Sequence, residues 1–130
     1  MDGSSYKSLV TPRGYMYGYY HQSPSENDHS KPSILFLHGF PSTSKDWSAQ
    51  VSHFTKQGYG VLAPDLLGYG KTEKPVDRKE YKTIDIVDDV VAILDKERLE
   101  KNTHVTPKHA TKDFVTKGER FEPQAMVSIQ

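Results

Sequence analysis

Apolar and polar positions follow one another in patterns that predict a β-hairpin and two further strands. Segments 6–11 and 15–20 are rich in aromatic and β-branched residues, and Pro12-Arg13-Gly14 between them has the composition of a turn. Segments 33–37 and 59–63 are short uninterrupted apolar runs, which are typical of strands covered on both faces. We therefore expect four strands, of which the first two form the hairpin.

Two longer segments have helical periodicity. The first begins at Ser44, which is placed to cap it, and ends at Gly58, with apolar positions spaced i, i+4 and i+7 at Trp47, Val51 and Phe54. This spacing predicts an amphipathic helix of about four turns. The second helix should run from about residue 83 to residue 100, and its expected apolar face consists of Ile84, Val87, Val91 and Leu94.

The order of these elements predicts the fold class. A hairpin followed by strand, helix, strand and helix is typical of an α/β fold with a mostly parallel sheet. Residues 1–102 contain all of the predicted elements. Residues 103–130 carry scattered charges, two prolines and no apolar periodicity, so we expect an irregular or disordered tail there.

The composition excludes several classes of function. Lys plus Arg and Asp plus Glu both total 17, so no long-range field favours nucleic acid or an anionic membrane. The chain has no cysteine, and its 6 histidines include no His-Glu-x-x-His motif, so we expect neither a metal nor another cofactor. No segment approaches the roughly 18 apolar residues that a membrane helix needs, and the first ten residues do not resemble a signal peptide. These features predict a soluble cytoplasmic protein.

The chemistry-bearing motif is His38-Gly39-Phe40-Pro41, which stands between a buried strand and a helix. Such a junction directs main-chain N–H groups outward at the carboxyl end of a sheet, where open α/β folds bind ligands. In hydrolases, donors of this kind stabilise an oxyanion. On the four residues alone, an ordinary strand-ending turn is an equally good interpretation.

A second motif, Gly70-Lys71-Thr72, invites comparison with a phosphate-binding loop, which ends in Gly-Lys-Thr. The complete motif requires a glycine five positions before Gly70, where this chain has Asp65. It also requires a helix starting at Lys71, whereas a polar run with Pro75 follows. We therefore predict no ATP or GTP site.

The sequence around both motifs resembles a known family. Residues 34–47 and 61–75 look like the first half of an α/β-hydrolase of the epoxide hydrolase group, particularly its fungal members. The resemblance covers roughly residues 5–101 and implies that Asp65 is a structural residue. The expected fold is thus an incomplete α/β-hydrolase fold that lacks the nucleophile strand and later elements.

The resemblance also implies a role for the first motif. The main-chain N–H of Phe40 would supply half of an oxyanion hole, supported by His38, Gly39 and Pro41, and the proline of this motif is often cis in the family. We expect the rings of Phe40 and Trp47 to line the substrate pocket. A phenylalanine at position 40 resembles epoxide hydrolases or esterases more than haloalkane dehalogenases.

The chain contains no catalytic nucleophile of the resembled family. Its chemistry needs Gly-x-Asp-x-Gly or Gly-x-Ser-x-Gly, followed by an acid and a histidine, and after Gly70 only Gly118 remains. We expect a truncated hydrolase that is inactive alone and acts on an epoxide or ester only if the fold is completed. The alternatives are a subunit completed in trans, a fragment of an esterase-type serine hydrolase, and a non-catalytic interaction or regulatory protein.

The absence of a nucleophile strand has a structural consequence. By resemblance, that strand would flank segment 33–37, so its absence should leave the edge of the most apolar strand unpaired. An unpaired edge is a template for strand addition by another chain. The sequence therefore predicts marginal stability and self-association through this edge.

Overall fold

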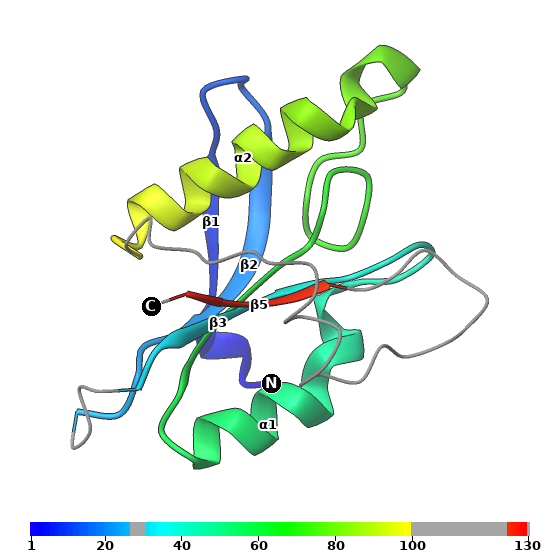
Figure 1. Cartoon of the computed structure of the whole chain (residues 1–130). Helices are drawn as coiled ribbons and strands as arrows, with labels where there is room; N and C mark the ends of the chain where they lie inside the picture. Colours follow the sequence, from blue (N-terminus) through cyan, green and yellow to red (C-terminus); the bar gives the residue numbers. More distant parts are fainter. Residues whose placement is uncertain (27–30, 100–124, 130) are drawn as a thin grey trace.

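The fold is built on a five-stranded mixed sheet with a helix on each face (Figure 1). The computed structural model describes residues 1–26, 31–99 and 125–129. The strand order is β1-β2-β4-β3-β5, and only β3 and β4 are parallel, so the sheet is mixed where the sequence predicted a mostly parallel one. The strands are β1 (Tyr6–Val10), β2 (Met16–Gln22), β3 (Ser33–Leu37), β4 (Gly60–Pro64) and β5 (Ala125–Ile129).

The predicted hairpin is confirmed. Strands β1 and β2 pair in antiparallel register from Tyr6 opposite Tyr20 to Val10 opposite Met16. The turn between them is closed by a hydrogen bond from the Gly14 N–H to the carbonyl of Thr11, 2.8 Å. Gly14 has a φ of 91°, a conformation that glycine adopts without steric cost.

The two helices bury their apolar sides against opposite faces of the sheet (Figure 1). Helix α1 (Ser48–Lys56) follows a 3₁₀ turn, η2 (Ser44–Trp47), and covers the face that carries Phe36 and Val61. Helix α2 (Thr83–Lys96) covers the other face through Val90 and Ile93. Among the residues described, neither helix has the length and apolar character needed to cross a membrane.

The start of the first helix differs from the prediction. Thr43, not Ser44, caps the segment, because the Thr43 side chain accepts a hydrogen bond from the Lys45 N–H. Ser44 is fully buried, and its hydroxyl shares a hydrogen bond with the Tyr6 hydroxyl, 3.0 Å. The predicted end is confirmed, since Gly58 follows the helix with a φ of 89°.

The predicted apolar face of α2 is largely wrong. Ile84, Val87 and Val91 are 66%, 49% and 40% exposed, while Asp89 is buried beside Val90 and Ile93. Arg13 and Tyr17 donate hydrogen bonds to the Asp89 carboxylate, so the side of the helix that carries Asp89 faces the sheet. The helix begins at residue 83 as predicted but ends at Lys96, before the predicted residue 100.

The tail contains a strand that the sequence pattern did not predict. Ala125–Ile129 forms β5 and pairs antiparallel with β3, from Leu37 opposite Ala125 to Ser33 opposite Ile129. The edge of β3 that was expected to be open is therefore paired within the chain, because β5 supplies partners for its main-chain groups. The remainder of the predicted tail, residues 103–124 and 130, lies outside the described residues.

Candidate functional site

The candidate site lies where β3 ends. After Leu37 the chain leaves the sheet and forms the segment 38–44 before η2 begins, and the Phe40–Pro41 peptide bond is cis. Phe40 is 63% exposed, and its N–H has no hydrogen-bond partner within the part of the chain that is described. Its ring is perpendicular to that of Tyr69, with centroids 6.2 Å apart. A main-chain donor is thus available at the carboxyl end of a buried strand.

His38 fixes the start of this segment. It is buried, and its Nε2 accepts a hydrogen bond from the Leu66 N–H, 2.8 Å. Because Nε2 is the acceptor, the neutral ring carries its proton on Nδ1, which donates to the carbonyl of Gly39, 2.9 Å. Both nitrogens are engaged in holding the main chain, and the predicted support of an oxyanion hole by His38 stays a prediction.

Asp65 fixes the same region from the neighbouring strand. It follows β4 directly and is 2% exposed. Its Oδ1 accepts from the Ser44 N–H at 2.7 Å, and its Oδ2 accepts from the Lys71 N–H at 2.9 Å. Gly70 packs so tightly on this carboxylate that a Cβ there would overlap Oδ2. Asp65 is therefore a structural residue, as expected.

These two side chains hold two segments together reciprocally. His38 reaches from segment 38–44 to the main chain of segment 65–71, and Asp65 reaches back from the second segment to the first. Buried hydrogen bonds of this kind leave an unpaired polar group when one partner is removed, at a cost of about 1–3 kcal/mol. The position of Phe40 relative to the glycine-containing segment is thus fixed from both sides.

The two expected pocket residues lie in different environments. Trp47 is 3% exposed, and its ring lies 5.0 Å from that of Phe36 in the core beneath α1. The ring contact of Phe40 is with Tyr69 instead. The packing of Trp47 is that of a core residue, and its place in a substrate pocket stays a prediction.

Tyr69 is a site residue that the sequence analysis missed. Its ring meets both the His38 ring, at 5.3 Å between centroids, and the Phe40 ring. The only sequence signal is its position between Gly68 and Gly70, which have φ values of 92° and 52°. Both glycines adopt left-handed conformations that allow the segment to turn tightly, and this turn brings Tyr69 beside the motif.

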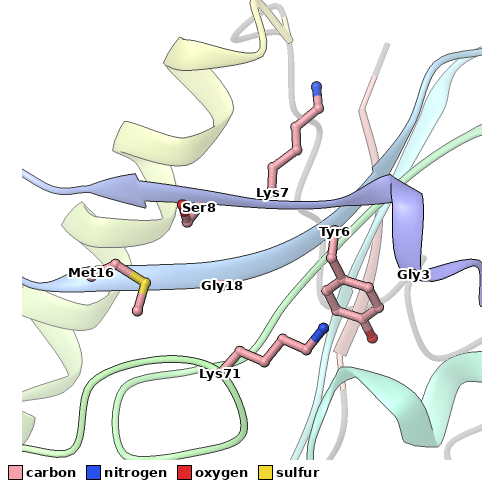
Figure 2. Close-up of a pocket in the computed structure, with 7 residues that line it drawn as sticks. All are labelled: Gly3, Tyr6, Lys7, Ser8, Met16, Gly18 and Lys71. Carbon is pink, nitrogen blue, oxygen red and sulfur yellow. The ribbon is translucent and has the colours of Figure 1, made fainter.

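A separate hollow of about 410 Å³ lies over the hairpin (Figure 2). Its lining includes Tyr6, Ser8, Met16 and Lys71, but no residue of segment 38–44. Figure 2 shows the Lys71 side chain reaching towards the Tyr6 ring, where Nζ lies 3.8 Å from the ring centroid. This cation–π contact positions the ammonium group, which keeps its charge. The lining also includes Lys7, whose Nζ is paired with Glu97.

The chemistry available at the Phe40 segment is stabilisation of a negatively charged oxygen. The described residues include no cluster of three His, Cys, Asp or Glu side chains that could hold a metal ion. His38 and Asp65 are both engaged with main-chain groups, whereas the Phe40 N–H has no partner in the described part of the chain. The segment can therefore bind an oxyanion, but it does not itself supply a nucleophile.

Comparison with known proteins places this geometry in a family. A model of the alpha/beta hydrolase fold matches residues 32–105, which is more than half of the chain and includes the Phe40 segment and α2. The chain belongs to the alpha/beta hydrolase fold family. The predicted fold class, a partial alpha/beta hydrolase fold, is thus confirmed, since the chain matches only part of the length of its larger relatives.

The relatives of this family member are epoxide hydrolases. An epoxide hydrolase of Caballeronia sordidicola is 39% identical over 64 residues, which is 49% of this chain and 20% of the relative. Human epoxide hydrolase 4 is 43% identical over 68 residues, 52% of this chain and 18% of the relative. This chain thus spans about a fifth of the length of these curated relatives.

Solved structures agree. An epoxide hydrolase from Vigna radiata superimposes with a TM-score of 0.62 at 31% identity, covering 72% of this chain and 28% of the other. An epoxide hydrolase from hot-environment metagenomes gives 0.64 at 26% identity, covering 72% of this chain and 30% of the other. The predicted resemblance to epoxide hydrolases is confirmed.

Proposed function

We propose that this chain supplies the oxyanion-binding part of an epoxide-hydrolase-type active site in the cytoplasm, and that it has no turnover alone. The observation that carries the proposal is that Phe40, at the carboxyl end of β3, is an exposed residue whose N–H has no partner among the described residues. The names of the relatives favour an epoxide over an ester as the substrate class. The absence of cysteine suits a reducing compartment.

The proposed reaction needs an aspartate nucleophile and a histidine base, for which the printed sequence has no family motif. An aspartate attacks an epoxide carbon, the carbon–oxygen bond of the ring breaks, and the epoxide oxygen takes up a proton. Water, which loses a proton to a histidine, then attacks the carbonyl carbon of the resulting ester. Before the ester bond breaks to release the diol and restore the aspartate, negative charge develops on the carbonyl oxygen. The Phe40 N–H would stabilise that oxygen, a contribution of about 3–4 kcal/mol for one such donor. No Gly-x-Asp-x-Gly or Gly-x-Ser-x-Gly motif occurs in the sequence.

Turnover assays on the whole chain test the first part of the proposal. We expect no product above the buffer blank from a styrene-oxide-like epoxide or from an aryl ester. Epoxide hydrolase B of Mycobacterium tuberculosis, which is 38% identical over 71 residues, provides the active comparison. Turnover of either substrate by the purified chain would refute the proposal.

A hybrid enzyme tests the role of the Phe40 N–H. Residues 5–101 of this chain would replace the matching segment of the Mycobacterium tuberculosis enzyme. In that hybrid Phe40→Pro removes the donor, whereas Phe40→Leu retains it. Loss of one oxyanion donor slows the hydrolytic step by about 10²–10³-fold, so this is the difference expected between the two variants. Equal rates in two folded variants, as judged by circular dichroism, would contradict the assignment.

A further inference from the structure

Strand β5 pairs with β3 along its whole length. Each of the five residues of β3 has a partner in β5. The family match ends at residue 105, so β5 lies outside the part of the chain that resembles the alpha/beta hydrolase model. The comparison with the family model therefore says nothing for or against this strand.

The strand that β5 covers is buried and apolar. Ile34, Leu35 and Phe36 are each less than 5% exposed, and β4 pairs with only one side of β3. Without β5, the N–H and C=O groups on the other side of β3 would have no partner. A long apolar edge in that state is a template for pairing with another chain.

Strand β5 runs in the opposite direction to β4. Strand β4 follows helix α1 and lies parallel to β3. Strand β5 is antiparallel to β3, with Ala125 opposite Leu37. Ala125, the first residue of β5, therefore lies at the end of the sheet where segment 38–44 begins.

We propose that Ala125–Ile129 is an intrachain closing strand that keeps β3 from pairing with a second copy of the chain. Displacement of β5 exposes the β3 edge and produces association of copies through that edge. This inference is independent of the proposed function, because no group of segment 38–44 takes part in it. The tests below measure cross-linking and mass, neither of which depends on turnover.

Cysteine pairs test the register directly, because the chain has no cysteine of its own. Leu37→Cys with Ala125→Cys places two thiols on directly opposed positions, and so does Ile34→Cys with Ser128→Cys. Opposed pairs in an antiparallel ladder alternate between hydrogen-bonded and non-hydrogen-bonded, so these two combinations sample one pair of each class. The control combines Leu37→Cys with Met126→Cys. Successive residues of a strand point to opposite faces, so the control thiols lie on opposite sides of the sheet.

Under mild oxidation, at least one opposed pair should form a disulfide within a monomer at least tenfold faster than the control. Non-reducing electrophoresis and mass spectrometry distinguish cross-links within a chain from those between chains. Equal rates for opposed and control pairs, or cross-links only between copies, would overturn the proposal.

Proline variants test the consequence of opening the edge. Met126→Pro and Val127→Pro each remove one N–H, and in a strand the N–H groups of adjacent residues face opposite edges. Proline on the outer edge is tolerated, whereas proline in a ladder removes a hydrogen bond. Sedimentation velocity should show a monomeric parent chain and concentration-dependent dimers or larger species for at least one variant. Two monomeric, folded variants would refute the closing role, and the cysteine pairs decide the matter if a proline variant fails to fold.

Discussion

Asp89 holds the turn of the hairpin against α2, so its replacement by asparagine should destabilise the fold. The carboxylate is 1% exposed and accepts hydrogen bonds from Arg13 Nη2 and from the Tyr17 hydroxyl, both at 2.7 Å. Arg13 Nε also donates to both carboxylate oxygens at 3.1 Å. Asparagine has nearly the same shape but no charge, and it keeps a single acceptor oxygen.

The expected loss follows from what remains after the substitution. Removing one partner of a fully buried ion pair costs about 3–5 kcal/mol. Arg13 is partly exposed and keeps weaker contacts with Glu80 and Asp85, at 3.6 and 3.7 Å, which reduces that cost. Tyr17 and Arg13 then compete for one oxygen, which adds part of the penalty for an unpaired buried donor. We therefore expect Asp89→Asn to lower the free energy of unfolding by about 2–4 kcal/mol, a large part of the roughly 5–15 kcal/mol typical of a domain.

Urea unfolding provides the measurement. Trp47 is the only tryptophan and is 3% exposed, so its fluorescence reports on loss of the core. The matched control is Asp85→Asn, which removes a carboxylate on the same helix that lies 3.7 Å from Arg13 and is 34% exposed. A charge of this kind near a helix N-terminus contributes about 0.3–1 kcal/mol. Equal losses for the two variants would show that burial and direct hydrogen bonding do not set the contribution of Asp89.

Two further predictions concern the hairpin and its partners. Burial acts to raise the pKa values of Asp89 and Glu97, but hydrogen bonds outweigh it, so both pKa values are lowered. Asp89 accepts from Arg13 and Tyr17. Glu97 accepts from Tyr19 and Lys7. The stability that these carboxylates contribute is present above about pH 4.5 and is lost as the pH falls through their lowered pKa values. Urea titrations at several pH values should therefore show a free energy of unfolding that declines towards acid pH, with a shallower decline for Asp89→Asn. Identical slopes for the parent chain and the variant would contradict this prediction. Gly18→Ala should lower the free energy of unfolding by about 1–3 kcal/mol, because its new Cβ would lie 2.6 Å from the Lys71 Cβ. The control Gly3→Ala has no atom within 4 Å of its new Cβ and should leave thermal unfolding unchanged.

The elements with a strong local pattern could be predicted from the sequence. The apolar runs that became β3 and β4 lie within one residue of their predicted bounds, and the hairpin turn at residues 12–14 is where turn chemistry placed it. The Phe40 segment could also be located, because a strand and a helix bracket it. In each case the order of residue types along the chain carries the signal, although the contacts that fix β3 and the Phe40 segment are between residues more than 20 positions apart.

The features that the sequence did not predict depend on contacts between residues far apart in the chain. The inward face of α2 is set by Asp89 and its partners on the hairpin, more than 70 residues away in sequence, and helical periodicity does not contain this information. Ser44 could not be separated from Thr43 as the cap without knowing that the Tyr6 hydroxyl binds Ser44. Strand β5 exists because β3 has an edge to pair with, and a five-residue segment carries too little periodicity to predict that.

The distribution of perturbed ionisable groups separates stability from chemistry in this chain. Strongly shifted pKa values often mark a catalytic site, where burial and charge tune a group for proton transfer. Here burial raises the pKa of Tyr17 and of Tyr19, and it lowers that of His21, a residue that contacts Glu97. Tyr17 and Tyr19 donate to Asp89 and Glu97, so all of these groups join β2 to α2 and none belongs to the segment around Phe40. These groups therefore hold the hairpin to the helix. Burial also raises the pKa of Tyr6, whose hydroxyl shares a hydrogen bond with Ser44 at the end of segment 38–44. The donor proposed at Phe40 is a main-chain N–H, which does not titrate.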